Sequence, residues 1–486
     1  MNTKTLKGRV ANGVFWNTVQ LVVNRGFDFL IKLVLAKLLY PEQFGLVGMA
    51  AVFASFVQVF NELGIGAALV QKKDADLREA HYHTAFWTGV IWSSFLYLLI
   101  AFVVAPLAAA FYNEPTLQRI IPILSIGVLS SPVNLVHNAQ LVKAMNFKKL
   151  AFISNASKLF SGILSLTLAL LGAGVWALVF NSVASFIIAM PLYFKATGWT
   201  PKFMWEEKAF RDIFGFGIYT TGTNVFNNLT SNIDYLLIGK LMSASALGTY
   251  TLAFVLTDTF RSQLMSIMNK VMYPVYGQKQ DDSHALKKYY LNVVKYNSLV
   301  VYPIMVFIFV LGEPFVLKIF GNRWVDTIIP LKILALSVMV HMMVNSNTSL
   351  IRGLGKPGLE MRIQLFKTLL IYVPTIVVGI HYYGITGAAC AILLNKILSV
   401  FIAQYFLKKL IDLSLIELIK ELRVPVLASL IAFAASRLLH EYSVNFIVCA
   451  VVLLFTYIIV VWLMMKEEII SQLRSLGIYK PKDKII

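Results

Sequence analysis

The residues of this chain that are best suited to chemistry are charged side chains inside long apolar stretches. Arg25, Asp28 and Lys32 interrupt the first such stretch, and Asp258 and Arg261 stand three residues apart in a later one. A charge at the centre of a membrane costs several kcal/mol, roughly 3 on insertion scales, and normally faces a water-filled cavity or a partner ion. The planar, multi-donor head of arginine suits a phosphate group. The pattern favours a wet cavity for an anionic cargo, with local ion pairs as the alternative.

Amide and hydroxyl side chains follow the same faces as these charges. At about 100° per residue, the polar residues of the first stretch fall within a wedge of roughly 140°: Asn17, Gln20, Asn24, Arg25, Asp28 and Lys32. Those of the seventh stretch fall within roughly 80°: Thr220, Asn224, Asn227, Ser231 and Asp234. Hydrogen bonds between membrane helices would explain the amides and hydroxyls as well as a cavity does.

Other kinds of chemistry find little support. His81 and His83 are a weak signal for a metal centre, and Cys390 and Cys449 fall in apolar stretches where small packing residues are expected. The longest predicted outer loop, 312–327, carries no paired catalytic constellation. We therefore expect a protein that is not an enzyme and that has no metal site.

The elements that must position the polar residues are membrane helices. Hydrophobic residues make up 58% of the chain and charged residues 14%. Apolar stretches of about twenty residues, the length that crosses a bilayer as a helix, recur about fourteen times. The first lacks a cleavage site, so it is no signal peptide. We predict an all-α polytopic membrane protein with spans at 11–36, 44–66, 84–111, 117–140, 149–171, 175–194, 213–239, 247–273, 290–311, 328–352, 360–380, 385–407, 424–439 and 444–465.

Basic residues set the predicted orientation. With the N-terminus inside, most of the 43 Lys and Arg residues fall in inner segments, and the positive-inside rule predicts that both termini are cytoplasmic. This bias accounts for most of the net charge of +19, so a nucleic-acid partner is not expected. Lys158, Lys295 and Lys367 lie near predicted inner helix ends, where snorkelling explains each as well as function does.

The chain also repeats itself. KLLYPEQFG at 37–45 aligns with KLMSASALG at 240–248, and QLVKAMNFKKL at 140–150 aligns with SLIRGLGKPGL at 349–359. GVWAL at 174–178 is answered by GITGA at 384–388. Six spans per repeat predict two parallel six-helix lobes, an arrangement of transporters that bind cargo between their halves. The predicted organisation is an N-lobe at 1–194, a cytoplasmic linker at 195–212, a C-lobe at 213–407, a C-terminal helix pair at 408–465 and a cytoplasmic tail at 466–486.

Several longer motifs resemble a known family. They are LAKLLYPEQFGLVGMA at 35–50, NELGIGAALVQKKD at 61–74, MNFKKLA at 145–151, LGAGVWALV at 171–179 and NIDYLLIGKLMSASALGTY at 232–250. They resemble bacterial polysaccharide exporters, the lipid-linked oligosaccharide flippases of the multidrug/oligosaccharidyl-lipid/polysaccharide exporter superfamily. The colanic-acid and teichuronic-acid exporter branch is the most similar in character. The resemblance covers nearly the whole chain.

The resemblance implies a multi-pass exporter of the bacterial inner membrane, with two lobes in a V around a central cavity. Its cargo would be an oligosaccharide repeat unit on undecaprenyl pyrophosphate, flipped by alternating access for exopolysaccharide, capsule or O-antigen (lipopolysaccharide) biosynthesis. Family members use cationic cavity residues for the pyrophosphate and acidic ones for ion coupling. The substrate-binding candidates here are Arg25, Arg261, Lys32, Asn24 and Asn227. The ion-coupling candidates are Asp28, Asp234, Asp258 and Glu62.

The resemblance implies no cofactor beyond a coupling ion, H⁺ or Na⁺, exchanged as in an antiporter. The expected partners are the lipid-linked oligosaccharide, membrane lipids and a polysaccharide polymerase or chain-length protein. One alternative is a cation-coupled multidrug exporter of the same superfamily, which should show acidic and aromatic cavity groups. The last alternative is a membrane polysaccharide polymerase or ligase, which would need a sizeable outer loop or a catalytic cluster.

Overall fold

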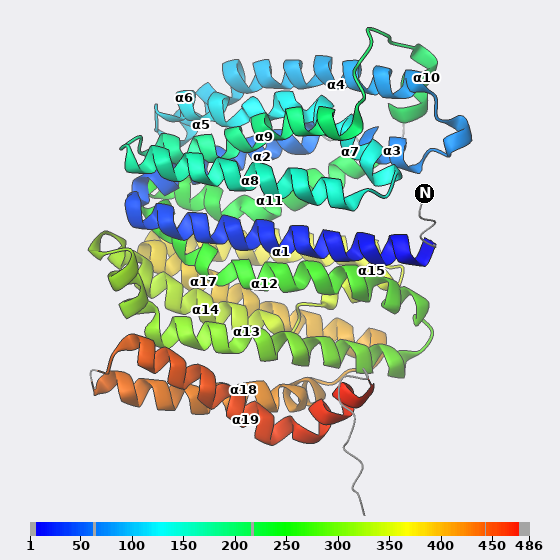
Figure 1. Cartoon of the computed structure of the whole chain (residues 1–486). Helices are drawn as coiled ribbons and strands as arrows, with labels where there is room; N and C mark the ends of the chain where they lie inside the picture. Colours follow the sequence, from blue (N-terminus) through cyan, green and yellow to red (C-terminus); the bar gives the residue numbers. More distant parts are fainter. Residues whose placement is uncertain (1–5, 62–64, 215–217, 443, 476–486) are drawn as a thin grey trace, which may run out of the picture. The chain divides into compact units, whose positions relative to one another are not determined.

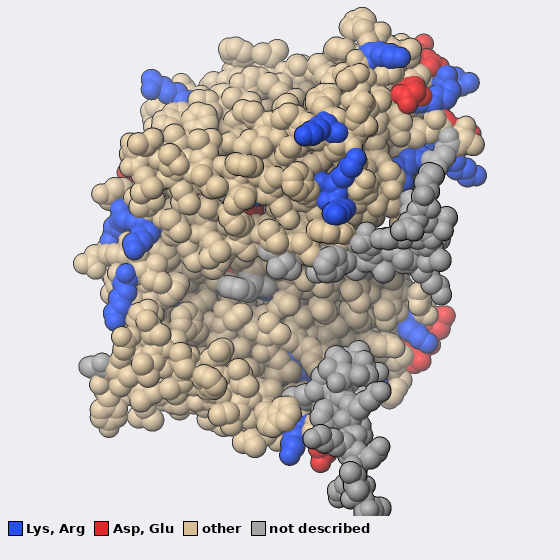
Figure 2. All heavy atoms as spheres, in the orientation of Figure 1, with Lys and Arg blue, Asp and Glu red and all other residues tan. Residues whose placement is uncertain are grey.

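The computed structural model of the chain describes residues 6–61, 65–214, 218–442 and 444–475 (Figure 1). This described part contains helices and no strands. Ten of its helical segments are long and apolar enough to cross a membrane. On the face drawn in Figure 2, charged side chains lie mainly toward the helix ends, and uncharged residues cover most of the rest. The prediction of an all-α polytopic membrane protein is confirmed.

The chain divides into two compact units, Met1–Thr251 and Leu252–Ile486, with the boundary inside helix α12. The division of the chain into lobes at 194 and 213 stays a prediction. The described elements of the first unit are α1 Leu6–Leu38, α2 Pro41–Asn61, α3 Ile65–Gln71, η1 Asp74–Asp76, α4 Glu79–Leu99, a π-helical turn Ile100–Val104, α5 Ala105–Tyr112, α6 Leu117–Leu124, η3 Ser125–Ser130, α7 Ser131–Lys143, α8 Phe147–Leu170, α9 Val175–Thr197, α10 Glu207–Phe214, α11 Ile218–Leu241 and the start of α12.

The second unit continues α12 and adds the remaining helices. These are α12 Ala244–Gln278, α13 Ser283–Ile319, η4 Asn322–Thr327, α14 Ile328–Met342, α15 Asn347–Gly353, α16 Pro357–Phe366, a π-helical turn Lys367–Tyr372, α17 Val373–Ile411, α18 Leu415–Glu441 and α19 Phe446–Ser475. Buried aliphatic and aromatic side chains of α12, α13 and α17 share one core cluster, and those of α13, α18 and α19 share another.

Each of the fourteen predicted stretches overlaps a helical segment, but the count of fourteen membrane spans stays a prediction. Two predicted stretches, 360–380 and 385–407, fall in the single candidate span Pro357–Ile411. That segment is interrupted at Gly384, whose backbone is not helical. The stretch predicted at 424–439 is too short, because α18 already begins at Leu415.

The early start of α18 has a local cause. The Ser414 hydroxyl accepts a hydrogen bond from the Glu417 backbone at 3.2 Å, and the Glu417 carboxylate accepts one from the Ser414 backbone at 2.9 Å. This capping box satisfies amides that would otherwise lack partners at a helix start. It extends the helix into charged residues that a hydropathy pattern leaves out.

Two glycines show the internal repeat in the backbone. Gly174, before α9, has φ 58° and ψ −128°, and Gly384, within the α17 segment, has φ 56° and ψ −137°. Only glycine populates positive φ without a steric penalty. The aligned motifs at 174–178 and 384–388 therefore adopt the same turn for the same reason.

A third pair of aligned residues meets in space within the first unit. The motifs at 37–45 and 240–248 place Gly45 on α2 opposite Ala244, and Gly248 on α12 opposite Pro41. A Cβ on either glycine would overlap the carbonyl oxygen of the residue it faces. The starts of α2 and α12 therefore cross in backbone contact, and the contact is reciprocal under the repeat.

The segment predicted as a linker is folded against α4. The Arg78 guanidinium donates to the Glu206 carboxylate at 2.8 Å, and the Trp205 indole donates to the Thr88 hydroxyl at 3.2 Å. Its helix α10 presents Asp212, which the Lys72 ammonium contacts at 2.7 Å. We call residues 199–212 the docked segment.

Asp212 also lies 3.2 Å from Nε2 of His81. Its hydrogen bonds, first with Lys72 and then with His81, hold the pKa of the Asp212 carboxyl below its ordinary value. The second histidine, His83, accepts a hydrogen bond from the Lys202 backbone at 3.1 Å. Both imidazoles thus fasten the docked segment to α4.

Candidate functional site

The polar face of α1 meets α8 in two successive contacts. The Asn24 amide donates to the Ser154 hydroxyl at 2.6 Å, and the Lys158 ammonium lies 3.2 Å from the Asp28 carboxylate. Each contact advances by four residues on both helices, so α1 and α8 run parallel here with one face of each in register. In Figure 1 the two helices lie side by side.

Three cations gather around the single carboxylate of Asp28. Lys32 lies close enough to Asp28, Lys158 and Arg25 for each charge to act on it. We call these four residues the α1–α8 cluster. It carries two more positive than negative charges, and its members lie on one face of α1 because residues three and four apart are neighbours on a helix.

The members of the cluster are accessible. The Asp28 and Lys158 side chains are 32% and 37% exposed, and Arg25 and Lys32 are exposed. Among the described residues, Arg25 has no hydrogen-bond or ion-pair partner. The cluster therefore has positive charge and, at Arg25, guanidinium donors to spare for an anion.

The second unit holds a comparable group. The Arg261 Nε atom donates to Asp258 at 2.6 Å, within α12, and both side chains are less than one-fifth exposed. The positive charges of Arg261, Lys367 and Lys396 all act on His341 of α14. We call these five residues the His341 cluster. The local ion pair that was the alternative for Asp258 and Arg261 is therefore present. Lys367 and Lys396 give the cluster more positive than negative charges.

The repeat relates the two clusters. The offset of 209 that aligns 140–150 with 349–359 takes Lys158 to Lys367. From the sequence alone, snorkelling explained both lysines as well as function did. The repeat is the signal that could have identified them as corresponding members of the two clusters. Lys295, the third lysine in that group, is instead held by the Glu468 carboxylate at 2.5 Å.

The remaining candidates lie elsewhere. Asp234 of α11 is 5% exposed and accepts a hydrogen bond from the Tyr250 hydroxyl. The Asn227 side chain and Glu62 lie outside the described residues. The structure therefore brings together Asn24, Arg25, Asp28 and Lys32 in the first unit, and Asp258 with Arg261 in the second.

Comparison with known proteins gives a consistent result. The family model described as "Polysaccharide biosynthesis protein" matches residues 34–329. One similar curated protein is the teichuronic acid biosynthesis protein TuaB of Bacillus subtilis (strain 168), which is 24% identical over 80% of this chain and 81% of its own length. Another is the lipopolysaccharide biosynthesis protein WzxC of Escherichia coli (strain K12), which is 22% identical over 83% of this chain and 82% of its own length.

A similar solved structure is the lipid II flippase MurJ in its inward closed conformation. It has a TM-score of 0.71 and 13% sequence identity, and the match covers 94% of this chain and 100% of MurJ. At this identity the likeness shows the fold.

Proposed function

We propose, from the premise that this chain belongs to the polysaccharide biosynthesis protein family, that it flips an undecaprenyl-pyrophosphate-linked oligosaccharide across a bacterial inner membrane. The product would serve the synthesis of a surface polysaccharide. Two curated relatives carry the names of teichuronic acid and lipopolysaccharide biosynthesis proteins, and a solved structure of the same fold is a lipid II flippase.

The observation that carries the proposal is the charge of the α1–α8 cluster. Three cations surround one carboxylate on helices of a membrane protein. Charges in such a place are costly unless they have partners or face water. A pyrophosphate supplies the missing negative charge, and Arg25 offers the donor geometry that phosphate oxygens accept.

The His341 cluster supports the same cargo. It repeats an excess of positive charge in the second unit and includes Lys367, the counterpart of Lys158. A cationic drug would be repelled by both groups, which disfavours a multidrug exporter. An alternating-access cycle with cytoplasmic termini would move the negative headgroup outward, and an inside-negative potential favours this by about 2.3 kcal/mol per charge per 100 mV. Proton or sodium coupling would reset the carrier.

The test is complementation of a capsule-forming bacterium that lacks its own flippase. Wild type should restore surface polysaccharide, and Arg25→Ala/Lys158→Ala should lower it about tenfold or more, because each lost charge-assisted hydrogen bond is worth roughly 1.5–3 kcal/mol. Lipid-linked repeat units should then accumulate in the inner leaflet. The matched control is Lys332→Ala, which removes a lysine paired with Glu313 at 3.1 Å, outside both clusters.

The outcomes separate the hypotheses. Equal rescue by wild type and by Arg25→Ala/Lys158→Ala, at equal membrane levels, would reject the α1–α8 cluster as the pyrophosphate site. Absence of rescue by wild type in hosts with several different glycans, together with export of cationic dyes, would favour the multidrug alternative.

A further inference from the structure

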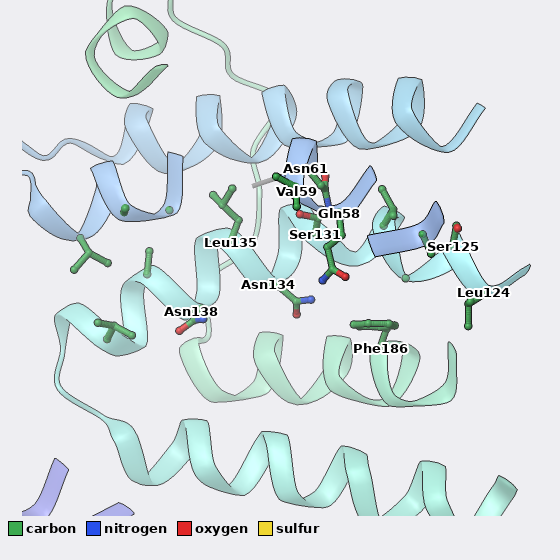
Figure 3. Close-up of a pocket in the computed structure, with 18 of the residues that line it drawn as sticks. Gln58, Val59, Asn61, Leu124, Ser125, Ser131, Asn134, Leu135, Asn138 and Phe186 are labelled. Carbon is green, nitrogen blue, oxygen red and sulfur yellow. The ribbon is translucent and has the colours of Figure 1, made fainter. Parts of the chain in front are cut away.

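A cavity of about 700 Å³ lies inside the first unit (Figure 3). Its lining comes from α2, α3, α6, η3, α7 and α9. None of the described side chains of α1 and α8, which carry the α1–α8 cluster, is among the lining residues. A volume of this size is typical of sites that hold small molecules.

The polar groups of this cavity are uncharged. Among the residues that the structure describes, no Asp, Glu, Lys or Arg lines it; Glu62, next to the lining residue Asn61, lies outside them. Amide side chains from three different helices line it: Gln58, Asn61, Gln71, Asn134 and Asn138. Figure 3 labels all of these except Gln71. Each amide offers donors and an acceptor together, which is the complement of a hydroxyl group.

Part of the hydrogen-bonding capacity of this wall has no partner among the described residues. Ser125 is 3% exposed, and its hydroxyl has no hydrogen-bond partner among the described residues. The Asn134 amide nitrogen donates to the Ser130 hydroxyl at 3.3 Å, which leaves its carbonyl oxygen directed away from that bond. The Ser125 oxygen is itself buried, so it adds to the polarity of the wall, and the half-buried Asn134 amide is the group of this pair that can bond a ligand.

One wall of the cavity is aromatic. Phe186 projects from α9 beside the amides (Figure 3). Its ring lies against the backbone at Gly127, where a Cβ would overlap it. The absence of a side chain at Gly127 therefore leaves room for the Phe186 ring in the cavity wall, and the face of an aromatic ring attracts the weakly positive C–H groups of a ligand.

The shape of the cavity is extended along α7. Ser131, Asn134, Asn138 and Val142 all line it, at the spacing of one helix face. Residues 131–142 are twelve residues of helix, and the eleven steps between the first and the last span about 16 Å. The cavity thus reaches from η3 to the end of α7, next to Lys143.

These features favour a neutral, hydroxyl-rich occupant. Among the described lining residues a phosphate would meet no cation, and a cationic drug would meet no carboxylate. An acyl chain would bury the amides without partners, which is unfavourable. We propose that this cavity binds the neutral sugar residues of the cargo, with the amides bonded to sugar hydroxyls and Phe186 stacked on a sugar ring. The inference rests on the proposed function and assigns the glycan and the pyrophosphate to different sites.

The test uses the full-length protein purified from the flippase-deficient strain that accumulates lipid-linked repeat units. Mass spectrometry measures two retained lipids, the repeat-unit lipid and added undecaprenyl pyrophosphate without sugar. Asn134→Leu/Asn138→Leu keeps the branched shape of each side chain but removes two amides. It should lower retention of the repeat-unit lipid about tenfold or more, while retention of the bare pyrophosphate lipid stays within about twofold. Arg25→Ala/Lys158→Ala should lower retention of both.

A second variant guards against misfolding. Phe186→Leu should also lower retention of the repeat-unit lipid, whereas Phe186→Trp should restore it. Unchanged retention of the repeat-unit lipid in Asn134→Leu/Asn138→Leu would overturn the inference. So would equal loss of both lipids in a variant that elutes and melts like wild type. If wild type retains neither lipid, the proposed function fails, and this inference falls with it.

Discussion

Replacing Gly174 and Gly384 by alanine measures the strain that the two related turns impose. Both residues have φ near +57° with ψ near −130°, a combination that a residue with a Cβ reaches only at a cost of about 1–3 kcal/mol. At position 174 the new Cβ would also lie 2.9 Å from the flexible Gln43 amide, which can move aside. We expect each substitution to lower the free energy of unfolding by about 1–3 kcal/mol.

The double variant makes the prediction stricter. The two glycines lie in different compact units, so their effects should add, to about 2–6 kcal/mol. Denaturant unfolding in detergent, followed by far-ultraviolet circular dichroism, measures both values. Gly358→Ala is the matched control, because Gly358 is a helical glycine of α16 with nothing within 4 Å of its Cβ position. A Gly384→Ala variant as stable as this control would refute the reasoning.

Three further predictions concern other parts of the fold. Gly45→Ala and Gly248→Ala should each lower the free energy of unfolding by about 1–3 kcal/mol. The double variant should lose less than the sum of the two, because one separation of α2 from α12 relieves both overlaps. Strictly additive losses would contradict the reciprocal contact. The hydrogen bonds that lower the pKa of the Asp212 carboxyl also stabilise the docked segment. This stabilisation is complete above pH 3.9, roughly the ordinary pKa of an aspartate, and is lost as the pH falls through the lowered pKa. Thermal midpoints should therefore fall below pH 4 more steeply in wild type than in Asp212→Asn, and parallel curves would dismiss the ion pair. In a Cys390→Ser variant, buried Cys449 should react with a thiol dye only on unfolding, and immediate labelling would show that its site is open.

Hydropathy predicted the helices well because burial in lipid demands long apolar runs. It misplaced the start of α18, where the Ser414–Glu417 capping box continues a helix through charged residues. It also gave no sign that 199–212 packs on α4, because that packing depends on indoles and ion pairs rather than on a periodic pattern.

The sequence predicted only those members of the candidate site that lie on one face of a single helix. The wedge on α1 placed Asn24, Arg25, Asp28 and Lys32 together, since helical spacing fixes their common face. Lys158 was undervalued, because its meeting with Asp28 depends on how α1 packs against α8. The uncharged cavity was not predicted, since its amides converge from separate helices and no single segment shows the pattern.

The crossing of α2 with α12 has a consequence for how such a chain can be assembled from halves. Each motif contains a backbone carbonyl and, four residues later, a glycine. The Pro41 carbonyl of the first motif packs on Gly248 of the second, and the Ala244 carbonyl of the second packs on Gly45 of the first. A surface that contains both a feature and its complement can bind a copy of itself about a twofold axis. A single six-helix half with this motif would thus carry a self-complementary interface, and joining two halves in one chain would convert a dimer contact into an internal one.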